Sequence, residues 1–150
     1  MPFEEWSRTG NNAFQKDLTI LNYNTKNGKI LSYKKNDDLV VNIVWSYKNK
    51  YPVAIIENVP FELVNNLVST VESFGDKVTL TQSDIDKLNR LLSIVSAQVT
   101  VYTYFPLLDI SSATDPSGIV TKYDYDSFGR LIRITQADKV IGWYDYHYKN

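Results

Sequence analysis

The chain has 150 residues, with 16 Lys and Arg against 17 Asp and Glu and a formal net charge of −1. This near-neutral balance provides no long-range field for attracting nucleic acid or an anionic membrane, so we expect no nucleic-acid partner. Cysteine is absent, which excludes disulfides, thiolate zinc sites and a cysteine nucleophile. No run approaches the roughly 20 apolar residues of a membrane span, and no signal peptide is recognisable, so we expect no membrane insertion.

The first third of the chain has the pattern of β-strands. Residues 1–16 are polar and mixed without either period, so we expect a weakly ordered lead-in followed by a single domain over 17–150. Residues 17–58 alternate apolar and polar side chains between turn segments at 24–28, 36–38 and 48–50. Asn27-Gly28 is a strong hairpin sequence. This part therefore predicts a four-stranded antiparallel meander.

The period changes to that of helices over residues 60–97. One helix is predicted after Pro60 and ends at Gly75, because apolar residues recur every three or four positions. A second helix is predicted to begin at Thr81, which forms a capping box with Asp84, and to bury a stripe that ends at Val95. A two-helix hairpin cannot bury both apolar stripes alone, so we expect it to lie on the sheet or on another subunit.

The β-pattern resumes at residues 98–148 and includes the most informative stretch of the chain. Tyr123 and Tyr125 alternate with Asp124 and Asp126, which is the period of a strand. Asp126 then begins a turn, and Gly129 stands where a positive φ is expected. The predicted fold class is α+β, an antiparallel β-meander sheet with an inserted two-helix hairpin. The last strand is predicted to run from 140 to 148.

These residues resemble a known family. The motif Tyr-Asp-Tyr-Asp-x-x-Gly-Arg-Leu, which ends in Gly129, Arg130 and Leu131, is similar to the YD-repeat unit of RHS-repeat proteins. The resemblance extends over residues 17–150, most clearly at 45–58 and 99–148, and is nearest to the C-terminal region of the Bacteroidetes type. It implies that Tyr123 to Asp126 and Gly129 to Leu131 are structural motif residues. Tyr23-Asn24 followed by Gly28-Lys29-Ile30-Leu31 resembles a degenerate copy of the same unit.

Three groups of residues invite a chemical interpretation. His147 is the only histidine, so a Ser-His-Asp arrangement would require it as the base, and a strand-end side chain is the simpler reading. Asp124 and Asp126 are spaced like paired carboxylates, but aspartates beside a turn also accept backbone N–H groups. The segment 115–119 resembles an RHS self-cleavage element without its extended context. We expect no catalytic residue, no metal and no cofactor.

Tyrosines recur in pairs along the second meander, and two interpretations of them stay open. An exposed face of rings would stack on sugars, with Tyr102, Tyr104, Tyr144 and Tyr146 as ligand-stacking residues. Cross-strand ladders of the same rings would instead hold the repeat together. The predicted function is a non-enzymatic structural and interaction module of an RHS/YD-repeat scaffold, with a carbohydrate-binding module as the alternative. The family resemblance implies a secreted or cell-surface setting, and sheet edges or the helical hairpin are expected to bind a protein partner or a second copy.

Overall fold

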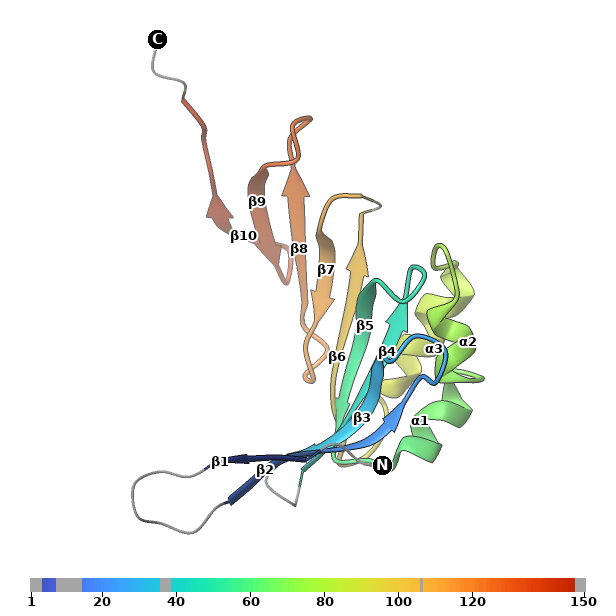
Figure 1. The fold of residues 1–150 in the computed structure, drawn as a ribbon. Coiled ribbons are helices and arrows are strands. Elements are labelled where there is room, and N and C mark those ends of the chain that lie inside the picture. Colours follow the sequence, from blue (N-terminus) through green and yellow to red (C-terminus); the bar gives the residue numbers. More distant parts are fainter. Residues whose placement is uncertain (1–3, 8–14, 36–38, 106, 148–150) are drawn as a thin grey trace. The chain divides into compact units, whose positions relative to one another are not determined.

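The computed structural model describes residues 4–7, 15–35, 39–105 and 107–147 (Figure 1). The chain divides into two compact units, residues 1–99 and residues 100–150. Antiparallel strands with an inserted helical segment confirm the predicted α+β class. The expectation of a single domain over 17–150 stays a prediction.

The first unit contains an antiparallel meander in which each strand pairs with the next along the chain. Its strands are β1 (Glu4–Ser7), β2 (Gln15–Tyr23), β3 (Ile30–Lys35), β4 (Leu39–Ser46) and β5 (Tyr51–Glu57). Strand β1 lies within the predicted lead-in and pairs with β2, and the weak order expected for residues 1–16 stays a prediction. The predicted turn at 36–38 lies outside the described residues.

The insertion contains three helices where the sequence predicts two. They are α1 (Phe61–Leu67), α2 (Val71–Gly75) and α3 (Gln82–Leu91). The first predicted helix is interrupted at Ser69, whose φ is 81°. The Asn65 Oδ1 atom accepts a hydrogen bond from the Val71 N–H at 2.8 Å, and the Thr70 side chain caps α2. The break therefore provides polar partners for the start of a new helix, while the apolar spacing continues across it.

Helix α3 begins as the sequence predicts, because its first turn is fixed locally. The Thr81 Oγ1 accepts from the Asp84 N–H at 3.3 Å, and the Asp84 carboxylate accepts from the Thr81 N–H at 3.0 Å. The helix ends at Leu91, so Val95, predicted to continue its apolar stripe, lies beyond it with 88% of its surface exposed. That part of the prediction is wrong.

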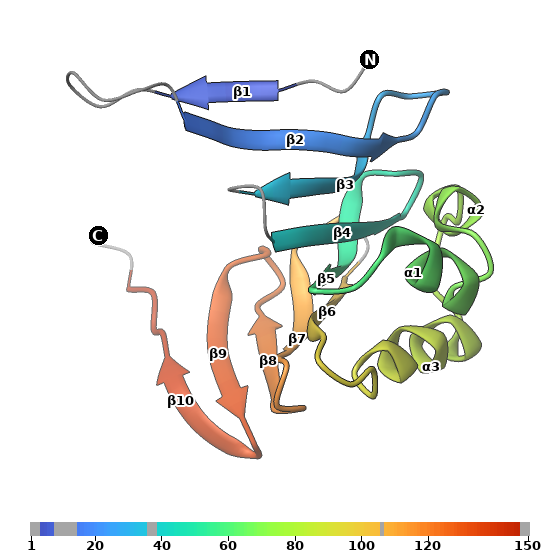
Figure 2. The ribbon, with the colours of Figure 1, turned by 90° about the horizontal axis from the view of Figure 1, so that it is seen from below.

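The three helices cover one face of the meander at β4 and β5 (Figure 2). Helix α2 contacts β4, and α3 contacts both α1 and β5. Fully or almost fully buried side chains from both layers form the core: Val41, Val44, Val53, Ala54, Ile56, Val59, Val64, Val68, Val71, Phe74, Leu88 and Leu91. Apolar burial of this kind is the main stabilising contribution to the unit.

The β4–β5 turn fastens the sheet to the helices. Tyr47, Lys48 and Asn49 all have positive φ values, of 54°, 58° and 59°. This conformation directs the Asn49 N–H to the Gly75 carbonyl at 2.8 Å and the Lys48 N–H to the Lys77 carbonyl at 2.7 Å. The turn thereby pairs carbonyl groups at the end of α2 that the helix itself leaves unbonded.

The second unit is built from β6 (Gln98–Tyr104), whose first two residues belong to the first unit, β7 (Ile110–Thr114), β8 (Val120–Tyr125), β9 (Leu131–Gln136) and β10 (Lys139–Trp143). Consecutive strands again pair antiparallel. Strand β10 ends at Trp143, so Tyr144 to His147 continue outside a strand, contrary to the predicted strand to 148. Pro106 and Tyr148 lie outside the described residues.

Candidate functional site

The β8–β9 turn is organised by the Asp126 side chain. Its Oδ1 atom accepts hydrogen bonds from the Phe128 and Arg130 N–H groups, each at 2.9 Å. The Gly129 N–H donates to the Asp126 carbonyl at 3.0 Å, and Gly129 has a φ of 77°, which favours glycine. The predicted turn, including the positive φ at Gly129, is therefore present.

The Arg130 side chain completes this turn electrostatically. Its Nη2 atom lies 2.7 Å from Asp126 Oδ2, and its Nε donates to the same oxygen at 2.7 Å. The backbone hydrogen bond from Arg130 is the largest cause that lowers the pKa of Asp126, with further contributions from the guanidinium group and the Phe128 N–H. Asp126 is thus held as an anion within the turn, which is unsuited to a general acid.

Asp124 is paired in the same way, but across strands. It lies opposite Arg133 in the β8–β9 register, and the Arg133 Nε donates to Asp124 Oδ2 at 2.7 Å. Each aspartate of the motif therefore has its own arginine. Within the described residues, no group of three or more metal-ligating side chains is assembled. The arrangement is that of structural ion pairs, not of two carboxylates that share a substrate.

Tyr125 anchors this hairpin to an earlier part of the repeat. Its hydroxyl donates to the Ile110 carbonyl at 2.9 Å, 15 residues earlier in the chain. Its ring lies edge-on to Phe105 with 6.0 Å between centroids. Burial is the largest cause that raises the pKa of Tyr125, and the Asp109 charge adds to it. The hydroxyl therefore stays protonated and continues to donate its hydrogen bond.

The same anchor occurs twice more. The Tyr146 hydroxyl donates to the Leu131 carbonyl at 2.8 Å, also 15 residues earlier. In the first unit the Trp45 Nε1–H donates to the Ile30 carbonyl at 2.8 Å, again across 15 residues. Tyr146 lies 21 residues after Tyr125, and Leu131 lies 21 residues after Ile110, so these two anchors are successive copies of one unit.

In two of the anchors a cationic side chain also lies over the aromatic ring. The Arg130 guanidinium lies 4.5 Å from the Tyr146 ring centroid, and the Lys29 ammonium lies 4.3 Å from that of Trp45. Lys29 follows a turn in which the Asn24 Oδ1 accepts from the Lys26 N–H at 2.9 Å and Gly28 has a φ of 72°. The first unit therefore has a similar turn and anchor at the position of the suggested degenerate copy, and the repeat relationship itself stays a prediction.

The predicted tyrosine face is divided by a strand of small residues. Tyr102 and Tyr104 lie on β6 and are partly buried, and Tyr123 and Tyr125 lie on β8. Strand β7 runs between them with the sequence Ile-Ser-Ser-Ala-Thr. Tyr144 and Tyr146 follow β10 and are 45% and 43% exposed. A cross-strand ladder and glycan stacking both stay predictions.

The other two candidate groups have local partners. Asp115 Oδ1 accepts from the Ser117 hydroxyl at 2.6 Å and from the Ser117 and Ile119 N–H groups, each at 2.9 Å. The Ser117 hydroxyl is the largest cause that lowers the pKa of Asp115. His147 Nε2 lies 3.2 Å from Asp145 Oδ2, and both side chains are largely exposed. Neither geometry assembles a nucleophile with a base.

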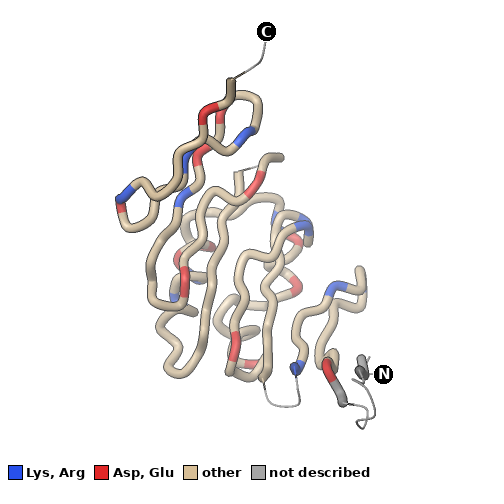
Figure 3. The backbone as a smooth tube through the Cα atoms, turned by 90° about the vertical axis from the view of Figure 1, so that its left-hand side faces the viewer, with Lys and Arg blue, Asp and Glu red and all other residues tan. Residues whose placement is uncertain are grey.

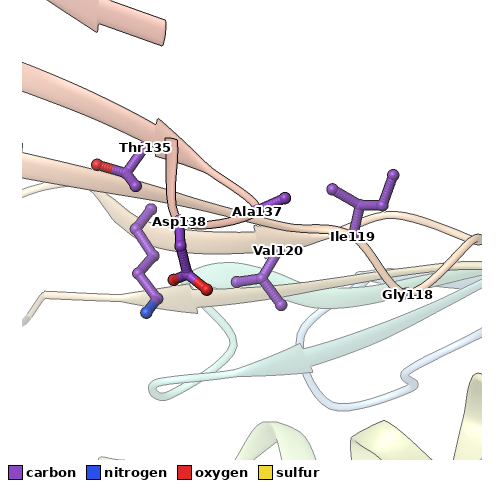
Figure 4. A pocket seen from close by; sticks show the side chains of 7 residues that line it. Gly118, Ile119, Val120, Thr135, Ala137 and Asp138 are labelled. Carbon is purple, nitrogen blue, oxygen red and sulfur yellow. The ribbon is translucent and has the colours of Figure 1, made fainter. Parts of the chain in front are cut away.

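A hollow of about 380 Å³ lies on the second unit beside the β7–β8 and β9–β10 turns (Figure 4). It is lined by Gly118, Ile119, Val120, Lys122, Thr135, Ala137 and Asp138.

Charged residues of both signs are interspersed along the chain instead of gathering in one long run (Figure 3). No helix within the described segments has the length and hydropathy needed to cross a membrane.

The sequence motif located the Asp126 turn but not the aromatic anchors. The spacing of 15 residues between Ile30 and Trp45, and between Leu131 and Tyr146, is present in the sequence, but the sequence alone does not indicate that these residues are hydrogen-bonded.

Residues 108–141 match the family model described as RHS Repeat. This match supports the RHS/YD-repeat resemblance, while the Bacteroidetes type stays a prediction. No curated protein matches the chain.

Proposed function

We propose, from the match of residues 108–141 to the RHS Repeat family model, that the chain is a non-enzymatic structural module of an RHS/YD-repeat scaffold. Such a scaffold would be a shell or surface protein associated with secreted bacterial effectors. The proposal is supported by the use of the motif's polar groups within the repeat itself. Asp126 binds Arg130, Asp124 binds Arg133, and the Tyr125 hydroxyl binds a backbone carbonyl.

The observation that carries the proposal is the pair of successive anchors. Tyr125 bonds to Ile110 and Tyr146 bonds to Leu131, at 2.9 and 2.8 Å. Each bond joins an aromatic residue to the carbonyl of the residue that begins a strand 15 positions earlier, so the same contact recurs in successive units. The Asp124–Arg133 ion pair joins one unit to the next. Repeat proteins gain stability through such nearest-neighbour contacts, and an added unit stabilises the array.

The proposal is tested by lengthening the array. We insert a second copy of residues 126–146 between Tyr146 and His147, which adds one repeat length in register and begins with the aspartate that organises the turn. A scaffold repeat should raise the midpoint of thermal unfolding and the dependence of the unfolding free energy on urea. The matched control carries the same inserted residues in shuffled order. Equal stability of the two extended chains would refute the scaffold proposal.

A carbohydrate-binding module is the second candidate, favoured by the exposed rings after β10. Trp143 and Tyr144 are 68% and 45% exposed, so their faces are available for stacking on sugar rings, whereas the Tyr146 ring, which is 43% exposed, has the Arg130 guanidinium over it. A glycan array with the unmodified chain would test this candidate. Binding that is lost in Tyr144→Ala, with unchanged thermal stability, would favour it over a purely structural role.

A further inference from the structure

The β2–β3 turn contains the one Asn-Gly pair of the sequence, Asn27-Gly28, and both residues are exposed (Figure 2). An asparagine that precedes glycine is chemically labile, because the glycine nitrogen attacks the asparagine Cγ atom without hindrance from a side chain. Nothing lies within 4 Å of the place that a Cβ atom on Gly28 would occupy, so water has access to this peptide unit. The turn therefore presents a reactive pair to solvent.

Two hydrogen bonds of the folded turn oppose this reaction. The Gly28 N–H donates to the Asn24 carbonyl at 2.8 Å, so an acceptor holds the proton that the attacking nitrogen must lose. Asn27 Oδ1 accepts from the Lys29 N–H at 3.0 Å, which holds the side-chain amide towards Lys29. Attack requires the amide carbon to turn towards the Gly28 nitrogen, so the reactive state is an opened turn.

The Asn24 side chain helps to keep the turn closed. Asn24 is 2% exposed, and its Oδ1 atom accepts from the Lys26 N–H at 2.9 Å. Asp126 makes a similar contact in the second unit, where its Oδ1 atom accepts from the Phe128 N–H at 2.9 Å. The Asn24 carboxamide thus belongs to the hydrogen bonds that restrain Asn27.

We propose that Asn27 is a site of spontaneous deamidation whose rate is set by the opening of this turn. The Gly28 nitrogen forms a bond to Asn27 Cγ, and Nδ2 leaves as ammonia with the proton that the Gly28 nitrogen gives up. Water then adds to one of the two carbonyls of the cyclic imide. Opening on one side leaves aspartate at position 27, and opening on the other side leaves isoaspartate, whose main chain runs through the former side chain.

The isoaspartate form should disturb the aromatic anchor that follows the turn. It adds one carbon atom to the main chain between Asn27 and Gly28, shortly before Lys29 and Ile30. The Lys29 ammonium lies 4.3 Å from the centroid of the Trp45 ring, and the Ile30 carbonyl accepts from Trp45 Nε1–H at 2.8 Å. Aspartate keeps the original main chain and an oxygen for the Lys29 N–H, so it should leave this anchor in place.

The test measures deamidation of the full chain by peptide mass spectrometry after incubation in mildly alkaline buffer. Water enriched in heavy oxygen labels each new carboxylate. The folded chain should react at least about tenfold more slowly at Asn27 than the same chain in guanidinium chloride, because only the opened fraction reacts. Asn24→Ala should raise the rate in the folded chain about five- to tenfold and leave the rate in denaturant unchanged. Asn24→Asp keeps the acceptor for the Lys26 N–H and should react like the unmodified chain.

Equal rates at Asn27 in the folded and denatured chain would overturn the restraint by the turn. So would a folded-state rate that is the same in Asn24→Ala and Asn24→Asp. Reaction in denaturant that is no faster at Asn27 than at the other asparagines would remove the site itself. The effect on the anchor is measured by thermal unfolding of aged chain, with isoaspartate quantified by isoaspartyl methyltransferase. Aged chain should unfold at a lower temperature than Asn27→Asp, and equal midpoints would refute the disturbance of the anchor.

Discussion

The Asn49 side chain occupies the space that a Cβ atom on Gly75 would need. Such a Cβ would lie 2.9 Å from Asn49 Cγ and would overlap Asn49 Oδ1. Gly75 is buried at the end of α2, and its carbonyl accepts the Asn49 N–H. The absence of a side chain at Gly75 therefore allows the β4–β5 turn to approach the helix.

Gly75→Ala should consequently lower the free energy of unfolding by about 1–3 kcal/mol, as overpacking of a close contact does. Urea denaturation followed by circular dichroism measures the change. Glu72→Ala on the same helix is the control and should change stability by less than about 0.5 kcal/mol. Asn49→Gly should relieve the clash, since glycine tolerates the positive φ at this position. Equal stability of Gly75→Ala and Glu72→Ala would contradict the proposed contact.

Gly129 and Gly118 form a matched pair in the second unit. Both have positive φ, of 77° and 83°, but a Cβ on Gly129 would lie 2.8 Å from Leu108 Cδ2, whereas nothing lies within 4 Å of one on Gly118. Gly118→Ala should cost about 1 kcal/mol for its backbone conformation, and Gly129→Ala should cost more. Leu108→Ala combined with Gly129→Ala should remove the excess, measured by thermal unfolding in a double-mutant cycle. Equal stability of Gly118→Ala and Gly129→Ala would mean that the Leu108 side chain moves away from the new Cβ atom at no cost in free energy.

The two tyrosine anchors differ in burial, so their hydroxyl groups should contribute differently to the free energy of unfolding. Tyr125→Phe removes a half-buried hydrogen bond to the Ile110 carbonyl and should cost about 1 kcal/mol. Tyr146→Phe removes an exposed one, which water replaces, and should cost less. Tyr123→Phe is a useful comparison on the same strand. A larger loss for Tyr146→Phe than for Tyr125→Phe would reverse the predicted order.

The Asp84 carboxylate should make the free energy of unfolding depend on pH in the acid range. Burial acts to raise its pKa, but hydrogen bonds from Thr81 and the Lys77 charge outweigh this, so the folded pKa is lowered. A lowered folded pKa adds stability that is present above the unfolded value of about 3.9 and is lost as pH falls through the folded pKa. Asp84→Asn should cost about 1 kcal/mol at pH 7 and less at about pH 2.5. Urea titrations at both pH values measure the difference, and Asp86→Asn serves as the control. A cost that does not shrink in acid would exclude this role for the carboxylate.

The helical insertion should protect the sheet. Deletion of residues 60–97, replaced by a short Gly-Ser linker, would expose the buried face of β4 and β5, including Val44 and Ile56. Exposed apolar sheet surface drives association, so the shortened chain should aggregate in light scattering. A soluble monomer with a β-sheet circular dichroism spectrum would refute the capping role.

Elements that are fixed by neighbouring residues could be predicted from the sequence. The start of α3 and the Asp126 turn are closed by hydrogen bonds over a few positions, so their composition alone identifies them. The break at Ser69 was missed because Val64, Val68, Val71 and Phe74 all face the core on either side of it. Nor could the sequence pair Trp45 with Ile30, because the contact depends on how intervening strands fold back.

The fixed distance between carbonyl and aromatic anchor limits where the chain can change length. Asn24 to Gly28 contains one residue more than Asp126 to Gly129, yet both turns close and both subsequent anchors span 15 residues. An additional residue is thus accommodated in the turn before Gly28 or Gly129, where the chain is exposed to solvent. A single residue added between Leu131 and Tyr146 would instead move the hydroxyl out of reach and reverse the faces of the following strand. Natural variation in length should accordingly concentrate in the turns that precede the anchoring carbonyl, while the interval from that carbonyl to the aromatic residue, including the turn within it, stays constant.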